Sequence, residues 1–315
     1  MTVEHQRAAG IATMLGSAAS NQVGAAIGAH AFPAIGPAGV VVVRQIVAAA
    51  VLLPIARPNL RKLTWPQWWP TLLLGVVFAV MNLSLYTAIE RIGLGLAVTL
   101  EVLGPLAVAL LGSRTRVDLL CALAAGAGVY VLVLPGPSSD YLGIGLGLVA
   151  AACWAAYIVL NRLLGQRLTG LQAPALGTSF SALLYLPVAV VLLAQGRFTV
   201  AGVAYAVVAG LLSSVVPYAA DLIALRRVPA RFFGLFMSVH PVLAALAGLI
   251  LLGQGLAAHE WAGIMIVIGV NALSVMVGRS TPLEVPDDRG RRVLVGSHGG
   301  GPGVLVGDRA TADHL

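Results

Sequence analysis

The sequence predicts an all-α membrane protein with ten transmembrane helices arranged as two inverted five-helix repeats. Three observations lead to this fold class. The 315 residues are 59% hydrophobic and only 10% charged, with a mean hydropathy of +0.93, which is far more apolar than a soluble domain of this size. The apolar residues form ten runs, each near the ~20 residues that a crossing helix needs. One segment of the first half is echoed in the second half.

The ten predicted spans follow one another through short loops that hold proline, glycine and charged residues. Three tryptophans, Trp65, Trp68 and Trp69, precede the third span, as aromatic residues do at a membrane interface. The predicted spans are 10–29, 36–56, 70–89, 93–112, 116–135, 142–163, 173–194, 201–223, 231–253 and 259–278.

Lysine and arginine gather in alternate loops, whereas the other loops hold only Arg91 and Arg197. By the positive-inside rule both termini are cytoplasmic, including the N-terminal segment 1–9. The net charge of +7 could suggest a nucleic-acid-binding protein, but the basic residues are scattered singly between apolar runs rather than gathered on one face. We interpret them as topology signals. The residues on the cytoplasmic side are Arg7, Arg57, Arg61, Lys62, Arg114, Arg116, Arg162, Arg167, Arg226, Arg227, Arg231 and those of the tail.

The internal echo joins residues 88–105 to residues 224–241 without a gap, at an offset of 136. It pairs Arg91 with Arg227 and Pro105 with Pro241. Because five spans are an odd number, the second unit must be inserted upside down, as in many secondary transporters. We predict a first repeat at 10–135 and a second at 142–278.

The first and sixth spans each carry small residues every four positions, which predicts a face for close helix contact. The tail, 279–315, is rich in glycine and charge and is predicted to be disordered in the cytoplasm. The small residues are Gly16, Ser20, Gly24 and Gly28 in the first span and Gly143, Gly147, Ala151 and Ala155 in the sixth.

The fourth span is an apolar run with one carboxylate, Glu101, and one proline, Pro105. Glu101 lies not far from the bilayer midplane, where a carboxylate costs on the order of 2.5–3.5 kcal/mol on insertion scales. Pro105 has no N–H to bond the Glu101 carbonyl, which predicts a broken helix lining a cavity. We predict that Glu101 faces the bundle interior as a substrate or proton site; a structural ion pair is the alternative.

Arg44 lies well inside the second span. Its guanidinium stays protonated and presents a planar fork suited to a carboxylate, so it needs an anion. Glu101 and the carboxylate of a substrate are both candidates, and the sequence leaves both open.

Two more ionisable residues lie beside prolines in the second half. Asp221 follows Pro217 in the eighth span, where snorkelling toward nearby arginines is the alternative to a functional role. His240 precedes Pro241 in the ninth span, where a hydrogen-bonded structural role and a titrating role are both open. Glu101, His240 and Asp221 are the predicted proton-coupling residues.

Neutral polar and aromatic side chains within the spans add candidate ligands, although most such groups only bond between helices. Asn21, Tyr86, Trp154 and Tyr157 are predicted to join Glu101 and Arg44 in binding substrate. Gln22, Asn82 and Ser84 are further candidates.

Enzymatic motifs are missing from the sequence, which predicts no catalytic residue, cofactor or metal site. The GIGLG run at 143–147 lies inside a predicted span and is interpreted as helix packing. Cys121 and Cys153 also lie in apolar runs, where packing as small hydrophobic side chains is expected rather than a disulfide.

Three segments resemble the EamA branch of the drug/metabolite transporter superfamily, and within it the threonine/homoserine exporters. They are LGLAVTLEVLGPLAVALLG, AACWAAYIVLNR and VVPYAADLIALRRVPARFFGLFMSVHPVLAALAGLILLG. The resemblance covers residues 10–278 and implies a cytoplasmic-membrane carrier with a central cavity between the repeats. His240, Asp221 and Gln254 depart from it, because such exporters commonly carry glutamate there.

We therefore predict an exporter of small amino acids or related metabolites, similar to threonine or homoserine, that works by proton antiport. Its partners are the substrate, protons and the lipid bilayer, with no nucleic acid, and a homodimer is left open. A carrier for another apolar or cationic metabolite and a non-transporting membrane sensor or scaffold are the alternatives. The predicted cavity lies at mid-depth, lined by spans one to four and six to nine.

Overall fold

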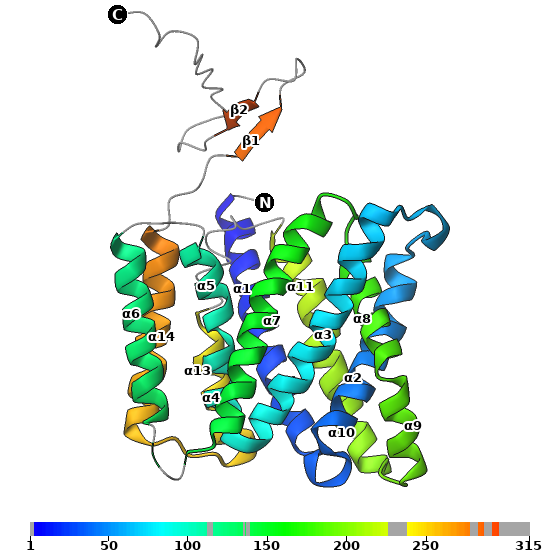
Figure 1. Ribbon diagram of the computed structural model, residues 1–315, viewed down its shortest axis with the longest axis horizontal. Coiled ribbons are helices and arrows are strands. Elements are labelled where there is room, and N and C mark those ends of the chain that lie inside the picture. The colour runs from blue at the N-terminus through cyan, green and yellow to red at the C-terminus, as the bar shows by residue number, and fades with distance from the viewer. Residues whose placement is uncertain are drawn as a thin grey trace, which may run out of the picture. The chain divides into compact units, whose positions relative to one another are not determined.

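The computed structural model describes residues 3–111, 116–134, 136, 139–225, 238–277, 283–286 and 292–295 (Figure 1). The chain divides into two compact units, Met1–Met276 and Val277–Leu315. In the first unit, all the regular structure that is described is helical. The helices of its first half are α1 (Val3–Ala29), α2 (Phe32–Ala56), η1 (Leu60–Lys62), α3 (Trp65–Ile92), α4 (Leu94–Glu101), α5 (Leu103–Leu111) and α6 (Arg116–Val133). Those of its second half are α7 (Tyr141–Gly165), α8 (Gln172–Leu184), α9 (Leu186–Ala194), α10 (Val200–Gly210), η2 (Leu211–Val215), α11 (Val216–Leu225), α13 (His240–Leu252) and α14 (Ala258–Val277).

Four helical stretches of the described part are long and apolar enough to cross a membrane, and the bent pair α8–α9 makes a fifth when it is taken as one span. The four are α2, α3, α7 and Val200–Ala220. Three shorter apolar helices, Leu94–Val108, Leu119–Val133 and His240–Leu252, lie within the fourth, fifth and ninth predicted spans. The first unit is thus an all-helical, multi-span bundle, and the count of ten spans stays a prediction.

Several predicted spans are interrupted. The fourth has a single turn residue, Val102, between α4 and α5, within the apolar helix Leu94–Val108. The seventh, predicted as one continuous segment, bends by 44° between α8 and α9. Pro187 lies in the first turn of α9, where it lacks an N–H and its ring cannot pack against the carbonyl of Leu183 in a straight helix. The eighth contains the π-helical turn η2 between α10 and α11.

Side-chain caps mark where some helices begin. Thr64 and Gln67 form a capping box at the start of α3, with the Thr64 N–H donating to Gln67 Oε1 at 2.9 Å. Asp140 caps α7 by accepting from the Gly143 N–H at 2.8 Å. This bond and a second from Arg91 hold the pKa of Asp140 below its usual value.

The predicted close contacts of the small-residue faces are confirmed for the inner positions of both helices. A Cβ on Gly24 would lie 2.8 Å from the Ser213 nitrogen, and a Cβ on Gly147 would lie 2.8 Å from the Leu100 side chain. Gly16, by contrast, has open space beside it. The two faces therefore hold α1 against η2 and α7 against α4.

The helices of the two halves pack in a reciprocal pattern. α1 packs against α10, η2, α11 and α13, which carry the eighth and ninth predicted spans, while α7 packs against α3, α4 and α5, which carry the third and fourth. In the same way α2 packs against α8 and α10, and α8 packs against α2 and α3. α4 and α13 pack against each other. Each half therefore supplies partners for the equivalent helices of the other.

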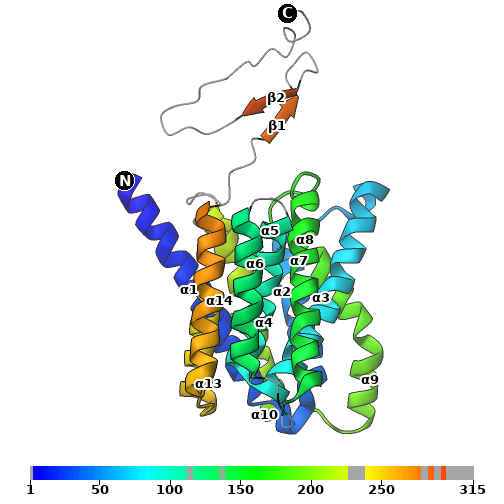
Figure 2. The same ribbon diagram turned by 60° about the vertical axis from the view of Figure 1, so that its left-hand side comes forward.

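The helices of the fifth and tenth predicted spans, α6 and α14, lie side by side at one edge of the bundle (Figure 2). A Cβ on Gly263 would lie 2.6 Å from the Leu132 backbone, so the two helices are in close contact. Cys121 packs with Leu106, Ala125 and Val270 in a small apolar cluster, as its apolar run predicts.

The second unit contains one described element, an antiparallel hairpin of β1 (Leu283–Pro286) and β2 (Arg292–Val295). Its register pairs Leu283 with Val295 and Pro286 with Arg292. The hairpin is a difference from the disordered tail that the sequence predicts, since LEVP and RVLV supply β-branched residues that suit a strand. The remaining residues of the tail lie outside the described part, so disorder there stays a prediction.

Candidate functional site

A buried arginine forms the centre of the candidate site. Arg44 lies at the middle of α2 with only 9% of its surface exposed. Its guanidinium donates through Nε to Ser214 Oγ at 2.9 Å, through one terminal nitrogen to Asn82 Oδ1 at 2.6 Å, and through the other to the Ser213 carbonyl at 2.8 Å. These three partners are neutral, so they satisfy hydrogen bonds without cancelling the charge.

Two residues of α3 support this arrangement. Asn82 donates through Nδ2 to the Phe78 carbonyl at 2.7 Å, which orients its amide oxygen toward Arg44. The ring of Tyr86, fully buried, lies 5.0 Å from the guanidinium carbon of Arg44, a distance typical of a cation–π contact. Tyr86, predicted to bind substrate, therefore contacts the arginine itself.

The π-helical turn η2 explains how a backbone carbonyl reaches the arginine. In a π-helix the hydrogen bonds span five residues instead of four, and such turns often occur at functional sites. Ser213 and Ser214 lie within η2 and are both buried. Neither serine was among the residues predicted from the sequence to form the site, although a pair of serines shortly before Pro217 in an apolar span was an available signal.

Glu101 is the last residue of α4, immediately before the break at Val102. It is 8% exposed, and no residue in the described part of the chain hydrogen-bonds or ion-pairs with its carboxylate. Arg44 is close enough to act on it electrostatically, and Cys153 of α7 is also within electrostatic range. Arg44 and Glu101 are thus neighbouring opposite charges that do not form a direct pair.

His240 lies across the bundle interior at the start of α13 and is 8% exposed. Its Nδ1 is 3.0 Å from Nε2 of Gln22 in α1, which makes a buried hydrogen bond between the two halves. The Trp154 ring of α7 meets the imidazole edge-on, with ring centroids 6.2 Å apart. In α1, therefore, Gln22 makes the polar contact, whereas the predicted ligand Asn21 is only half-buried.

The remaining predicted site residues lie in α5, α7, α11 and α13. Tyr157 packs its ring against Phe78 with centroids 5.5 Å apart, and Tyr218 of α11 packs on the same phenylalanine. Asp221 belongs to α11, and its side chain lies outside the described part. The three predicted helix-breaking prolines each lie in the first turn of a helical segment: Pro105 in α5, Pro217 in α11 and Pro241 in α13.

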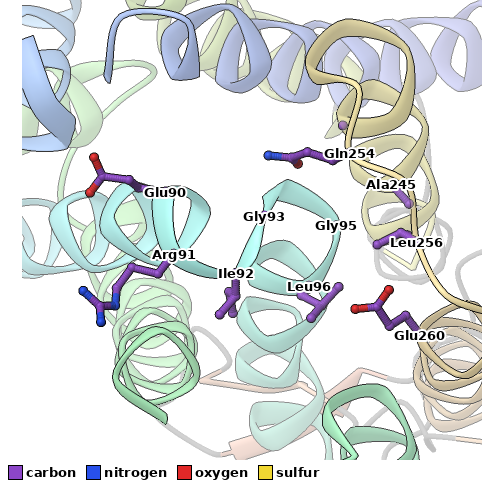
Figure 3. Close-up of a pocket in the computed structure, with 12 residues that line it drawn as sticks. Glu90, Arg91, Ile92, Gly93, Gly95, Leu96, Ala245, Gln254, Leu256 and Glu260 are labelled. Carbon is purple, nitrogen blue, oxygen red and sulfur yellow. The ribbon is translucent and has the colours of Figure 1, made fainter. Parts of the chain in front are cut away.

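A pocket of about 340 Å³ opens at the end of the bundle where α3 meets α4 (Figure 3). Its residues include Glu90, Gly93, Gln254 and Glu260. It therefore lies at the end of the α4–α13 contact rather than beside Glu101, where the sequence predicts a cavity. Among the residues that the structure describes, no group of three or more His, Cys, Asp or Glu gathers as metal ligands do.

Apolar helices that enclose an arginine and a carboxylate in their interior are typical of membrane proteins with a functional site inside the bundle, such as transporters. Comparison with known proteins agrees. Residues 141–276 match the model of the EamA-like transporter family. The chain is 34% identical over 275 residues to the threonine/homoserine exporter RhtA of Escherichia coli (strain K12), which covers 85% of this chain and 92% of that protein.

RhtA of Salmonella typhimurium (strain LT2) is 33% identical over 278 residues, covering 86% of this chain and 93% of that one. The chain therefore belongs to the EamA-like transporter family. These relatives are membrane transporters rather than enzymes, and with the apolar helices they indicate a multi-pass inner-membrane protein. A solved crystal structure aligns with a TM-score of 0.59 and 18% identity over 85% of this chain and 98% of that one, a likeness of fold alone.

Proposed function

We propose that this chain exports small zwitterionic amino acids, such as threonine or homoserine, across the cytoplasmic membrane in exchange for protons. The observation that carries the proposal is the bonding of Arg44. A guanidinium has five N–H groups, and three of them are used by Asn82, Ser213 and Ser214. Two N–H groups remain for a carboxylate, and the charge has no anionic partner within bonding distance in the described part.

Glu101 supplies the complementary charge. Its carboxylate has no bonding partner among the described residues, and it lies at the end of α4, next to Val102. A buried carboxylate without a partner is costly, so binding an ammonium group or a proton would stabilise it. A zwitterion placed between Arg44 and Glu101 satisfies both charges, and a proton on Glu101 competes with its ammonium group. That competition is sufficient for antiport.

The surroundings suit a small substrate. Trp154 and Tyr157 of α7 and His240 of α13 come from the second half of the chain, whereas Arg44 and Glu101 come from the first, so both halves contribute. The hydrogen bond between His240 and Gln22 joins the second half of the chain to the first. Protonation of the His240 imidazole would turn both ring nitrogens into donors and so change this bond. His240 and Asp221 are proposed as secondary proton sites.

The same proposal includes ten spans in two inverted repeats. The reciprocal packing of α1 and α7 supports it, because a pseudo-two-fold axis in the membrane plane exchanges the partners of equivalent helices. The interruption of α4–α5 before Pro105 also parallels the start of α13 beside Pro241. Alternating access would then move one set of helices against the other around the proposed site at Arg44 and Glu101.

We propose that both ends of the chain face the cytoplasm, from the positive charges of the loops. A reporter enzyme that is active only in the cytoplasm, fused after Ser280, should therefore be active. A matching reporter that requires export should be inactive at the same site but active when inserted at Gln195, in the loop between α9 and α10. The reverse activities would contradict this orientation.

The proposed substrate class is tested by comparing amino-acid efflux from cells with and without this chain. Cells loaded with threonine or homoserine should release them faster when the chain is present, and release should be slower for analogues that lack the ammonium or carboxylate group. A panel containing an amine, a carboxylic acid and a neutral alcohol of the same size provides the comparison. Equal efflux of the amine and the zwitterion would point instead to a carrier of cationic metabolites.

A further inference from the structure

The pocket at the α3–α4 turn lies at the end of the contact that leads to the proposed site. Its walls include Gly95 of α4 and Ala245 of α13. These residues are in tight contact, since a Cβ on Gly95 would lie 3.2 Å from the Ala245 Cα. Farther along the same two helices come Glu101 and His240. The pocket and the proposed site are therefore two ends of one helix–helix seam, closed between them by side-chain packing.

Gln254 holds this end of the seam together. Its Oε1 accepts a hydrogen bond of 2.9 Å from the Leu94 N–H, at the first turn of α4. Its own N–H donates to the Gly248 carbonyl of α13 at 3.0 Å. In Figure 3 the side chain of Gln254 extends from the α13 side toward the turn at Gly93. One residue thus ties α4 to α13 at the mouth of the seam.

The charges around the pocket favour a cation. Glu90 and Glu260 both line it, whereas its one lining guanidinium, that of Arg91, is paired with Asp140 at 2.9 Å. Glu260 uses one oxygen to accept from the Ala257 N–H at 2.6 Å and keeps the other available. Figure 3 shows its carboxylate on the side of Leu96 and Leu256. With the Arg91 charge balanced by Asp140, the lining has an excess of negative charge, and such an excess in a concave site raises the local concentration of cations.

We propose that this pocket is an outer release site, which binds the ammonium group of the departing amino acid at Glu260; this inference rests on the proposed function and its orientation. A volume of about 340 Å³ is at the small end of ligand pockets and fits a small amino acid. Because the net negative lining repels the carboxylate, binding is through one end only and therefore weak. Weak binding suits a site from which solute must leave.

The test introduces one additional cysteine, either at the pocket or at a control position. Leu256→Cys places a thiol in the pocket wall, and Val200→Cys places one at a residue that is 90% exposed at the start of α10. α10 begins at the same end of the bundle as the pocket (Figures 1 and 2). Cells carrying each variant are treated from outside with a bulky, membrane-impermeant methanethiosulfonate. Cells carrying the unsubstituted chain are treated in the same way, to measure any effect of the reagent on the native Cys121 and Cys153.

Labelling of Leu256→Cys should reduce threonine efflux to the level of cells without the chain, whereas labelling of Val200→Cys should leave it unchanged. External threonine should slow the labelling of Leu256→Cys only. Glu260→Gln in the Leu256→Cys background should weaken that protection, because the amide keeps an oxygen for the Ala257 N–H but loses the charge.

Complete labelling of Leu256→Cys with unchanged efflux would overturn the release site, as would protection by threonine that Glu260→Gln does not alter. If neither thiol reacts from outside, the pocket faces the cytoplasm and the inference is wrong. A parent chain that exports no amino acid refutes the proposed function instead, and that result is separate because it needs no cysteine or reagent.

Discussion

Replacement of Glu101 by glutamine should abolish export driven by a pH gradient while the protein still folds and inserts. The amide has the shape of the carboxylate but can neither release a proton nor balance an ammonium group. Because no described residue bonds to the Glu101 carboxylate, the change removes no internal hydrogen bond or ion pair, and folding should be little affected. The loss should therefore appear in transport rather than in protein abundance.

The measurement is amino-acid flux driven by an imposed pH gradient in proteoliposomes. Glu101→Asp retains a carboxylate and should keep part of the coupled flux, which makes it the matched control. His240→Asn removes the titrating ring but leaves an amide that can bond to Gln22, so it separates proton coupling from packing. Undiminished gradient-driven flux in Glu101→Gln would refute proton coupling through Glu101. Loss of that flux in His240→Asn alone would indicate that the coupling residue is His240, in the second half of the chain.

Replacement of Arg44 by lysine should weaken substrate binding strongly although the charge is kept. Lysine offers a point charge on a flexible stem and cannot bond Asn82, Ser213 and Ser214 while presenting a fork to a carboxylate. Losing one partner of a buried, hydrogen-bonded charge pair costs about 2–5 kcal/mol, which corresponds to a rise in KM on the order of 30-fold or more.

This prediction is checked by concentration-dependent uptake into inside-out vesicles, with the KM for threonine compared between variants. Arg162→Lys, at an exposed position of α7, is the matched control and should leave the KM unchanged. The fluorescence-detected elution profile of each variant verifies folding. An unaltered KM in well-folded Arg44→Lys would show that the guanidinium is structural and that the substrate carboxylate binds elsewhere.

Some parts of the site could be predicted from residue type and position alone. Arg44 and Glu101 are unmistakable in the sequence, since an ionisable residue within an apolar run is expensive and must face the protein interior. Pro105, Pro217 and Pro241 were predicted to break their helices because each lacks an N–H, but Leu94–Val108 and Val200–Ala220 run on through Pro105 and Pro217, so these helix breaks stay a prediction.

The partners of those residues could not be predicted in the same way. Ser213, Ser214 and Gln22 are ordinary small or polar side chains, and their roles depend on helices distant in sequence: Gln22 and His240 are 218 residues apart. The bend at Pro187 was also missed, because an apolar run of the right length hides a break when proline is the only signal.

By itself the sequence determined that this chain is an apolar, multi-span helical protein with opposite charges inside, because hydropathy and the cost of a buried charge are local properties. Only the tertiary structure decided that Arg44 bonds to neutral partners instead of Glu101, and that Gln254 ties α4 to α13. Those outcomes depend on how helices from the two halves pack and on where a π-helical turn exposes a carbonyl. Such contacts are set by geometry between distant segments, which no local pattern of residues records.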